Sequence, residues 1–489
     1  MRNVGVYHET IRSKRRQNLT MKKGLKIGYP YLAILFITVL IPCLTSAQEE
    51  KEAVRLEQIT VTAPGEKEGI TITPQSTIIH VEKYKTPGTP QNIVDILKDR
   101  AIIDFRGSSD LVETNDNVYM RGFDTRGFVT ATDGLSVEKV GGYKGGHFVD
   151  FSTIPFGQIE SIEIISGPHS ALYSSRALGG VINIKTRTPK RCETLKPNFK
   201  VMTSYRSYNT QTHRFNVDGG ADSFIYDFSY EKYRTNGYLR NNRADIDTIS
   251  GRFGYILPSD GYISLNVTYQ DAKRERPVNN DPKGKYKDYY DGSYPRTESG
   301  SNPLDEPRRD KEPYSFRLNI KQPTIIGEWK LGAYYSHEDQ IYHYEQGKKW
   351  RYKTEWNSYG TNIQNEFRLF EDHLVTVGFD FMQLRYRWEK MDESYAGFIQ
   401  DRWNIIPRLT LTAGLRYEDI NIWWNNKNIR SGVYCNPAIQ KDEIKKGYHQ
   451  FVPKSFLTYE LDDLSDLLRD TSISAGVSRI WTPKSYCQI

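Results

Sequence analysis

The 489-residue chain carries a formal net charge of +7, which would suggest an anionic partner if the charge were spread evenly. Residues 1–47 hold eight of the 67 Lys and Arg and one of the 60 Asp and Glu, leaving 59 of each. Because the remainder of the chain is neutral, its charge gives no support for nucleic-acid binding. The length of the chain allows one large domain with a smaller one, or three ordinary domains.

The first predicted element is an export signal. Residues 22–47 have a basic start, an apolar stretch at 31–41 and a small-residue end, with cleavage expected after Ala47. The apolar stretch is shorter than the roughly 20 residues of a membrane-spanning helix. The residues before Met21 fit no export pattern, so Met21 is an alternative start. A lipoprotein signal ending at Cys43 is disfavoured, because a proline stands where a small residue is expected.

Three cysteines follow the signal: Cys192, Cys435 and Cys487. They are too widely spaced for a disulfide framework or a CxxC metal site, and at most one pair can form. The sequence has no HExxH, G-x-S-x-G or Walker pattern. We therefore expect no enzyme activity, no cofactor and no metal site.

A short extended segment follows, EQITVTAP at residues 57–64. Its centre, Ile59 to Thr62, consists of strand-favouring residues, and Pro64 ends the strand. It has no neighbouring segment with which to pair.

Residues 70–190 read as a compact α+β unit. A short helix is predicted within residues 90–99, with Ile93, Ile96 and Leu97 on one face. Short strands bounded by Gly and Asp are predicted around it. They lie at residues 117–123, 127–134, 159–166 and 179–186.

From Phe199 onward, apolar and polar residues alternate with period two. In one segment, Ile263, Leu265, Val267 and Tyr269 share a face opposite polar neighbours. A soluble β-sandwich also alternates. Segments of about ten residues, aromatic residues at their ends, and one polar connection at 271–312 among tight turns favour a transmembrane β-barrel instead.

Several short motifs occur in a fixed order along the chain. They are Arg121-Gly122-Phe123, Asp133-Gly134, DFSTIP at 150–155, IESIEIISGPHSALYSSRALGG at 159–180, VINIKT at 181–186, YAGFIQDRW at 395–403 and LTLTAGLRYE at 409–418. In this order, and behind an export signal, they resemble the TonB-dependent receptors of Gram-negative outer membranes. The resemblance covers Leu56 to the end.

The resemblance implies a transmembrane antiparallel β-barrel with an N-terminal α+β plug domain in the outer membrane. It divides the chain into a signal peptide (1–47), a periplasmic segment (48–69), a plug (70–190) and a partial barrel (191–489). The periplasmic segment then carries the TonB box, which a TonB-type protein grips as an added strand. The box residues are Glu57, Gln58, Ile59, Thr60, Val61, Thr62 and Ala63. An ordinary first strand of the plug is the alternative interpretation.

The resemblance also implies roles for single residues. Arg121 is expected to pair with barrel acids and lock the plug, while Ser166 stands where a second family arginine is common. The loop at 137–148 offers Tyr143, Lys144 and His147 for an anionic chelate. A solvated Gly-rich loop is the alternative there.

The implied function is uptake of a scarce metal chelate, first a ferric siderophore, with cobalamin or haem as alternatives. The expected partners are a TonB-type protein, outer-membrane lipid and the chelate, with the receptor monomeric. A porin would lack the 120-residue unit before the barrel, and an adhesin would carry a passenger. We count about thirteen strands against the 22 of plugged transporters, and the chain lacks a terminal aromatic residue. A truncated receptor is therefore expected, and a non-functional fragment is the further alternative.

Overall fold

The structure, a computed structural model, describes most of the chain after residue 68. The described residues are 69–73, 76–84, 93–99, 102–105, 118–141, 146–168, 170–191, 197–298, 300–344, 350–387, 389–425, 441–461 and 471–483. All of them belong to one compact unit, Val61–Ile489. The expected signal peptide, the TonB-box residues 57–63, and Tyr143 and Lys144 lie outside the described residues.

The described residues between 69 and 191, here called the N-terminal domain, contain a six-stranded sheet in the order β1-β2-β10-β11-β6-β7. Its strands are β1 (Ile70–Ile72), β2 (Ser76–His80), β6 (Val129–Thr132), β7 (Leu135–Ser136), β10 (Ile159–Ser166) and β11 (Gly180–Thr186). Only the β11–β6 pair is parallel. Smaller sheets join β3 (Asp104–Phe105), β4 (Val118–Met120) and β5 (Phe123–Asp124), and β8 (Lys139–Gly141) with β9 (Gly146–Phe148).

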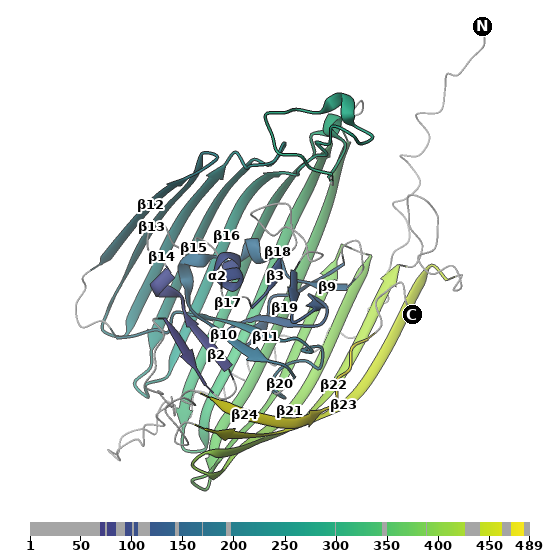
Figure 1. Ribbon diagram of the computed structural model, residues 1–489. Coiled ribbons are helices and arrows are strands. Elements are labelled where there is room, and N and C mark those ends of the chain that lie inside the picture. Colours follow the sequence, from purple (N-terminus) through teal and green to yellow (C-terminus); the bar gives the residue numbers. More distant parts are fainter. Residues whose placement is uncertain are drawn as a thin grey trace, which may run out of the picture. The chain divides into compact units, whose positions relative to one another are not determined.

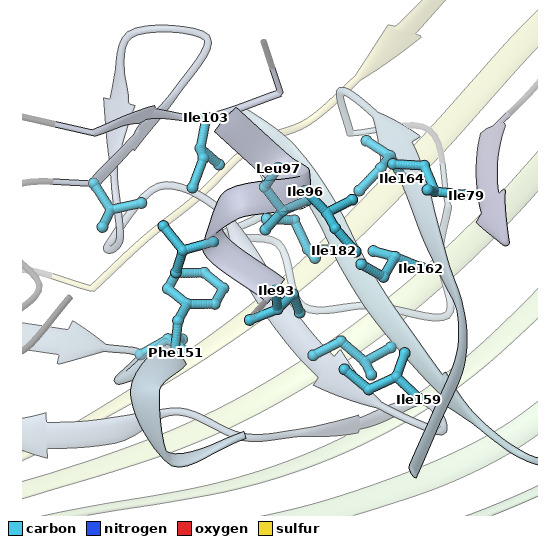
Figure 2. Close-up of a cluster of buried hydrophobic side chains, with 14 of the residues drawn as sticks. Ile79, Ile93, Ile96, Leu97, Ile103, Phe151, Ile159, Ile162, Ile164 and Ile182 are labelled. Carbon is cyan, nitrogen blue, oxygen red and sulfur yellow. The ribbon is translucent and has the colours of Figure 1, made fainter. Parts of the chain in front are cut away.

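One helix, α2 (Ile93–Asp99), packs on this sheet and confirms the helix predicted within residues 90–99. Ile93, Ile96 and Leu97 are fully buried against sheet residues that include Ile162 and Ile182 (Figure 2). Full burial of an aliphatic side chain contributes roughly 1.5–3 kcal/mol. This core gives the N-terminal domain internal cohesion of its own.

Short 3-10 turns lie at η1 (Val81–Tyr84), η3 (Phe151–Thr153) and η4 (Phe156–Gln158).

The rest of the described chain forms one antiparallel sheet of thirteen strands, in which each strand pairs with its neighbour in sequence (Figure 1). This matches the count expected from the alternation. The strands are β12 (Asn198–Arg206), β13 (Thr210–Ala221), β14 (Phe224–Thr235), β15 (Ala244–Ile256), β16 (Tyr262–Glu275), β17 (Arg308–Thr324), β18 (Gly327–Tyr344), β19 (Trp350–Leu369), β20 (His373–Tyr386), β21 (Lys390–Ile406), β22 (Leu409–Asn425), β23 (Glu443–Glu460) and β24 (Ser472–Ser478).

The two faces of this sheet have opposite chemistry. The inner face, defined as the side that contacts the N-terminal domain, is polar, whereas the outer face is apolar. In β16, Leu265 and Tyr269 are 39% and 43% exposed, while the polar Asn266 and Gln270 are each 4% exposed. Apolar side chains outside and polar ones inside are the reverse of a soluble sandwich and suit a wall facing lipid. No helix in the described ranges is long and apolar enough to span a membrane.

Aromatic rings on the outer face form contacts between neighbouring strands. Ring centroids are 6.2 Å apart for Tyr314 and Tyr335, and 4.9 Å apart for Phe381 and Tyr395. Aromatic rings on the outer face are typical of the aromatic girdles of membrane barrels.

Several strands are longer than expected, because main-chain pairing continues into their polar ends. β19 has 20 residues, against about ten predicted. The predicted loop at 271–312 is shortened to residues 276–307, since Lys273 pairs with Asp310 in the ladder. That connection contains η5 (Lys287–Tyr289) and η6 (Pro303–Asp305). Polar side chains did not end these strands, because main-chain pairing does not depend on side-chain polarity.

Candidate functional site: the contact between the N-terminal domain and the sheet

The first fastening point of the N-terminal domain is the turn that begins at Asp150. Asp150 caps the turn by accepting a hydrogen bond from the Ser152 amide at 3.1 Å, and Lys311 of β17 donates to its carboxylate at 2.5 Å. Arg274 of β16 donates to the Ser152 hydroxyl at 2.7 Å, and Gln270 donates to its carbonyl at 3.2 Å. Two adjacent strands of the sheet thus hold one turn of the N-terminal domain.

The Asp150–Lys311 pair is almost completely buried, with side chains 2% and 1% exposed. Burial by itself raises the pKa of Asp150, but the charges of Lys311, Lys139 and Arg274 outweigh it and hold the pKa below its ordinary value. The carboxylate therefore remains ionised while the turn is docked.

A second fastening point centres on Glu138 and His147. Arg176 forms an ion pair with Glu138, and the His147 Nδ1 atom lies 3.1 Å from the same carboxylate. The His147 Nε2 atom lies 2.6 Å from the Asp392 carboxylate of β21. The imidazole thus joins a carboxylate of the N-terminal domain to one of the sheet.

The titration of both groups follows from this geometry. Burial raises the pKa of Glu138. The charges and hydrogen bonds of Arg176 and His147 lower it by more, so the net shift of the pKa is downward. Burial and the Arg176 charge lower the pKa of His147, whereas hydrogen bonds to Asp392 and Glu138 raise it, and the net shift is upward. Docking therefore favours the charged form of both side chains.

Two further contacts involve glutamates of the sheet. Lys139 of β8 forms a buried ion pair with Glu338 of β18. Glu418 of β22 accepts from the Ser175 amide at 3.0 Å and from its hydroxyl at 2.5 Å. Arg416 donates to Glu418 at 2.7 Å and so orients that carboxylate. The interface consists largely of polar bonds that can be exchanged for water, unlike a continuous apolar core.

The β8–β9 hairpin is the apolar exception. Its Val140 and Phe148 pack in a buried cluster with residues of the sheet rather than with the core around α2. Those sheet residues are Trp356, Leu384, Tyr386, Ile420, Ile422, Trp424 and Ile444. Trp356 also donates from Nε1 to the Val140 carbonyl at 3.0 Å. The hairpin carries the loop that was predicted to contact substrate, so the base of that loop is fixed to the sheet.

Two open cavities lie along the contact. One, of about 80 Å³, is lined by Tyr173, Tyr334 and Met382 together with the charged Asp380 and Arg416. The other, of about 90 Å³, is lined by residues that include Ile154, Gln158, Gln270 and Arg317. Both combine apolar walls with a few charged groups, but each is smaller than the roughly 300–1,000 Å³ of a typical small-molecule site. No group of three or more potential metal ligands occurs among the described residues.

The predicted site residues have different surroundings. His147 is 12% exposed, with each ring nitrogen close to a carboxylate, so in this state its ring is engaged in the contact. Arg121 is exposed, with a backbone φ of 52°, and within the described ranges it forms no ion pair with the sheet. Its locking role stays a prediction.

Sequence reasoning missed the residues that do fasten the domain. Asp150 belongs to the quoted DFSTIP motif, and an Asp two residues before a Ser is a recognisable turn signal. Its partner Lys311 lies 161 residues further along the chain, and no local pattern indicates that pairing.

Two family models match the chain. The TonB-dependent Receptor Plug Domain matches residues 71–181. The TonB dependent receptor-like, beta-barrel family matches residues 194–486.

Among curated proteins, the hemin receptor of Yersinia pestis is 25% identical over 410 residues, which is 77% of this chain and 56% of the receptor. The heme/hemopexin utilization protein C of Haemophilus influenzae is 26% identical over 392 residues, which is 71% of this chain and 51% of that protein. The chain spans about half the length of these relatives.

Among solved structures, the copper transporter OprC superposes with a TM-score of 0.64 at 15% identity, covering 83% of this chain and 64% of OprC. The FrpB iron transporter from Neisseria meningitidis gives a TM-score of 0.61 at 15% identity, covering 80% and 62%. At this identity the likeness bears on the fold alone. It confirms the predicted fold class, an antiparallel transmembrane barrel wall with an N-terminal α+β domain.

Proposed function

Because the chain belongs to the TonB-dependent receptor family, we propose that it takes up a scarce metal chelate across the outer membrane with energy from a TonB-type partner. Both matched families are domains of receptors. This agrees with the expectation that the chain is not an enzyme. The proposed division is a periplasmic segment at 48–69, a plug at 70–190 and barrel strands at 191–489.

The observation that carries this proposal is the polar contact between two parts with separate cores. The N-terminal domain has its own apolar core around α2, yet it meets the sheet through ion pairs such as Asp150–Lys311. Such a domain can leave the sheet without losing its own core. A passive pore has no use for that arrangement, whereas a gated transporter requires it.

In the proposed mechanism, the substrate binds from outside, and the segment at 57–63 becomes available in the periplasm. A TonB-type protein adds a strand to this segment through main-chain hydrogen bonds. Energy delivered through the added strand displaces the N-terminal domain, and the polar contacts with the sheet are exchanged for water. The substrate then passes along the inner face.

Two substrate classes merit direct comparison. A ferric siderophore is the class inferred from the family resemblance. Haem is favoured by the two relatives named above, which are a hemin receptor and a heme/hemopexin utilization protein. Cobalamin is the third alternative.

The test uses cells in which this chain is the only such receptor. Radiolabelled ferric siderophore, haem and cobalamin are supplied separately, and surface binding and energy-dependent uptake are both measured. Ile59→Pro removes a main-chain donor from the proposed box, so we expect binding to persist and uptake to disappear. Ile59→Val, which keeps the strand propensity, is the matched control and should transport normally.

Uptake that persists in Ile59→Pro would disprove coupling through this segment. Binding and uptake of none of the three substrates by the unaltered chain would instead favour a non-functional fragment.

A further inference from the structure

The inner face of three neighbouring strands, β15, β16 and β17, carries positive charge and no negative charge. These strands are described in full. The bases on that face are Arg252, Arg274, Arg309, Lys311, Arg317 and Lys321. The acids of the same strands all lie on the outer face: Asp245, Asp247, Asp271, Glu275, Asp310 and Glu312.

The bases extend along the length of the wall. Four of them lie on β17 between Arg309 and Lys321, a separation of twelve residues that spans roughly 40 Å at the rise of a β-strand. This is comparable with the thickness of a bilayer including its headgroups. The positive face therefore runs from the end near the long 276–307 connection towards the tight turn after β17.

Charge repulsion within the sheet makes this arrangement costly for stability. Arg274 and Arg309 are direct partners in the β16–β17 ladder, with side chains on the same face. Like charges in directly opposite positions destabilise a sheet, and buried charges normally need a counter-charge. If these bases had only a structural role, neutral polar side chains in their place would make the sheet more stable.

Arg252 and Lys321 form ion pairs with acids of the neighbouring strands. Arg252 lies 3.5 Å from Asp227 of β14, and Lys321 lies 2.7 Å from Glu328 of β18. Because both acids belong to the sheet, these two ion pairs persist whether the N-terminal domain is docked or displaced.

Three others bond to the N-terminal domain. Lys311 pairs with Asp150, Arg274 donates to Ser152, and Arg317 donates to the Thr132 carbonyl at 3.2 Å. Arg274 is 1% exposed, and its Nε and Nη2 atoms have no hydrogen-bond partner among the described residues. Displacement of the N-terminal domain uncovers all three cations together.

We propose that the inner face of β15–β17 is an anion-binding wall, and that Asp150 occupies it in the resting state as a stand-in for an anionic substrate group. The proposal rests on the proposed transport function and narrows the substrate class to chelates with a net negative charge. Carboxylate, phosphate or sulfonate groups of the passing chelate replace Asp150 on Lys311 and occupy the free donors of Arg274.

The first test compares uptake of three ferric chelates of similar size that carry negative, zero and positive charge. The unaltered chain should favour the anionic chelate. Arg274→Gln should reduce uptake of that chelate about tenfold, the lower end of electrostatic focusing, while surface binding is unchanged. Lys273→Gln is the matched control, because Lys273 is the next residue of β16 and lies on the outer face.

Preference for the cationic chelate, or an equal effect of Arg274→Gln and Lys273→Gln, would overturn the proposal. Absence of uptake for every chelate would instead count against the proposed transport function. The second measurement would then test by itself whether the wall binds anions.

The second measurement needs no transport. Asp150→Asn keeps the turn cap but removes the carboxylate that pairs with Lys311, so that Glu338 of β18 is the acid left to act on it. Inorganic phosphate, compared with chloride at equal ionic strength, should raise the Tm of the purified Asp150→Asn protein about 2–4 °C more than that of the unaltered protein. Adding Lys311→Gln should abolish the difference. An equal response of the single variant and the unaltered protein would show that the wall takes no anion.

Discussion

Glu338→Gln tests whether buried ion pairs hold the N-terminal domain on the sheet. The change leaves Lys139, whose side chain is 8% exposed, without its carboxylate partner. Breaking a buried pair on one side costs about 3–5 kcal/mol. Asp150 also interacts with Lys139, so the lower value of about 3 kcal/mol is expected here. At 1.36 kcal/mol for each tenfold, this corresponds to roughly 150-fold more frequent opening of the β8–β9 hairpin.

Hydrogen exchange of the hairpin amides in the purified protein measures this opening directly. Asp339→Asn is the matched control, because Asp339 is the next residue of β18 and pairs with Lys353, whose side chain is 58% exposed. An exposed pair contributes about 0–1 kcal/mol, so exchange should rise less than about sixfold. The double variant Lys139→Met with Glu338→Gln should recover most of the protection. Equal exchange in Glu338→Gln and Asp339→Asn would refute the reasoning.

Three further predictions concern other parts of the contact and core. Since the pKa of His147 is raised by docking, its stabilisation is complete below about 6.5 and is lost as pH rises through the docked pKa. The opening free energy of the hairpin, obtained from exchange rates corrected for the intrinsic rise of amide exchange with pH, should therefore fall from pH 6 to pH 9, and His147→Gln should remove that dependence; an opening free energy that does not change with pH in the unaltered protein would contradict it. Trp424→Ala deletes a fully buried ring and should lower the free energy of unfolding by about 3–5 kcal/mol, measured by denaturant titration. A loss below about 1 kcal/mol would contradict that packing. Gly180→Ala should prevent folding, because the new Cβ would lie 2.3 Å from the Ile165 carbonyl oxygen at a φ of 126°; normal assembly in membranes would refute this.

The sequence predicts the elements well where their periodicity is strong. The alternation around Leu265 and Tyr269 gave the correct faces of β16, since every second residue meets one environment. The helix face of Ile93, Ile96 and Leu97 followed from the same reasoning at the helical period. Strand ends were less predictable, because main-chain pairing at Lys273 and Asp310 does not depend on side-chain polarity.

The fastening residues were not predictable, because they depend on which distant segments meet. His147 was expected to face substrate, and nothing near it in sequence indicated Asp392, which lies 245 residues away. The charge separation on β15–β17 is different, since it is visible in the sequence once the face of each strand is known. Arg309, Lys311 and Arg317 all fall at odd positions, in phase with the buried Pro313.

The placement of β1 at the edge of the six-stranded sheet has a mechanical consequence. β1 pairs with β2 only from Ile70↔Ile79 to Ile72↔Thr77, and Gly69 bonds to His80 at the open end of this hairpin. Tension applied to the chain before Gly69 separates these pairs one after another, as in unzipping. Each step breaks one hydrogen bond, worth about 0.5–1.5 kcal/mol, instead of shearing many bonds together. A weak pull is then enough to start removing the edge of the sheet, while the central strands β10 and β11 are not yet under load.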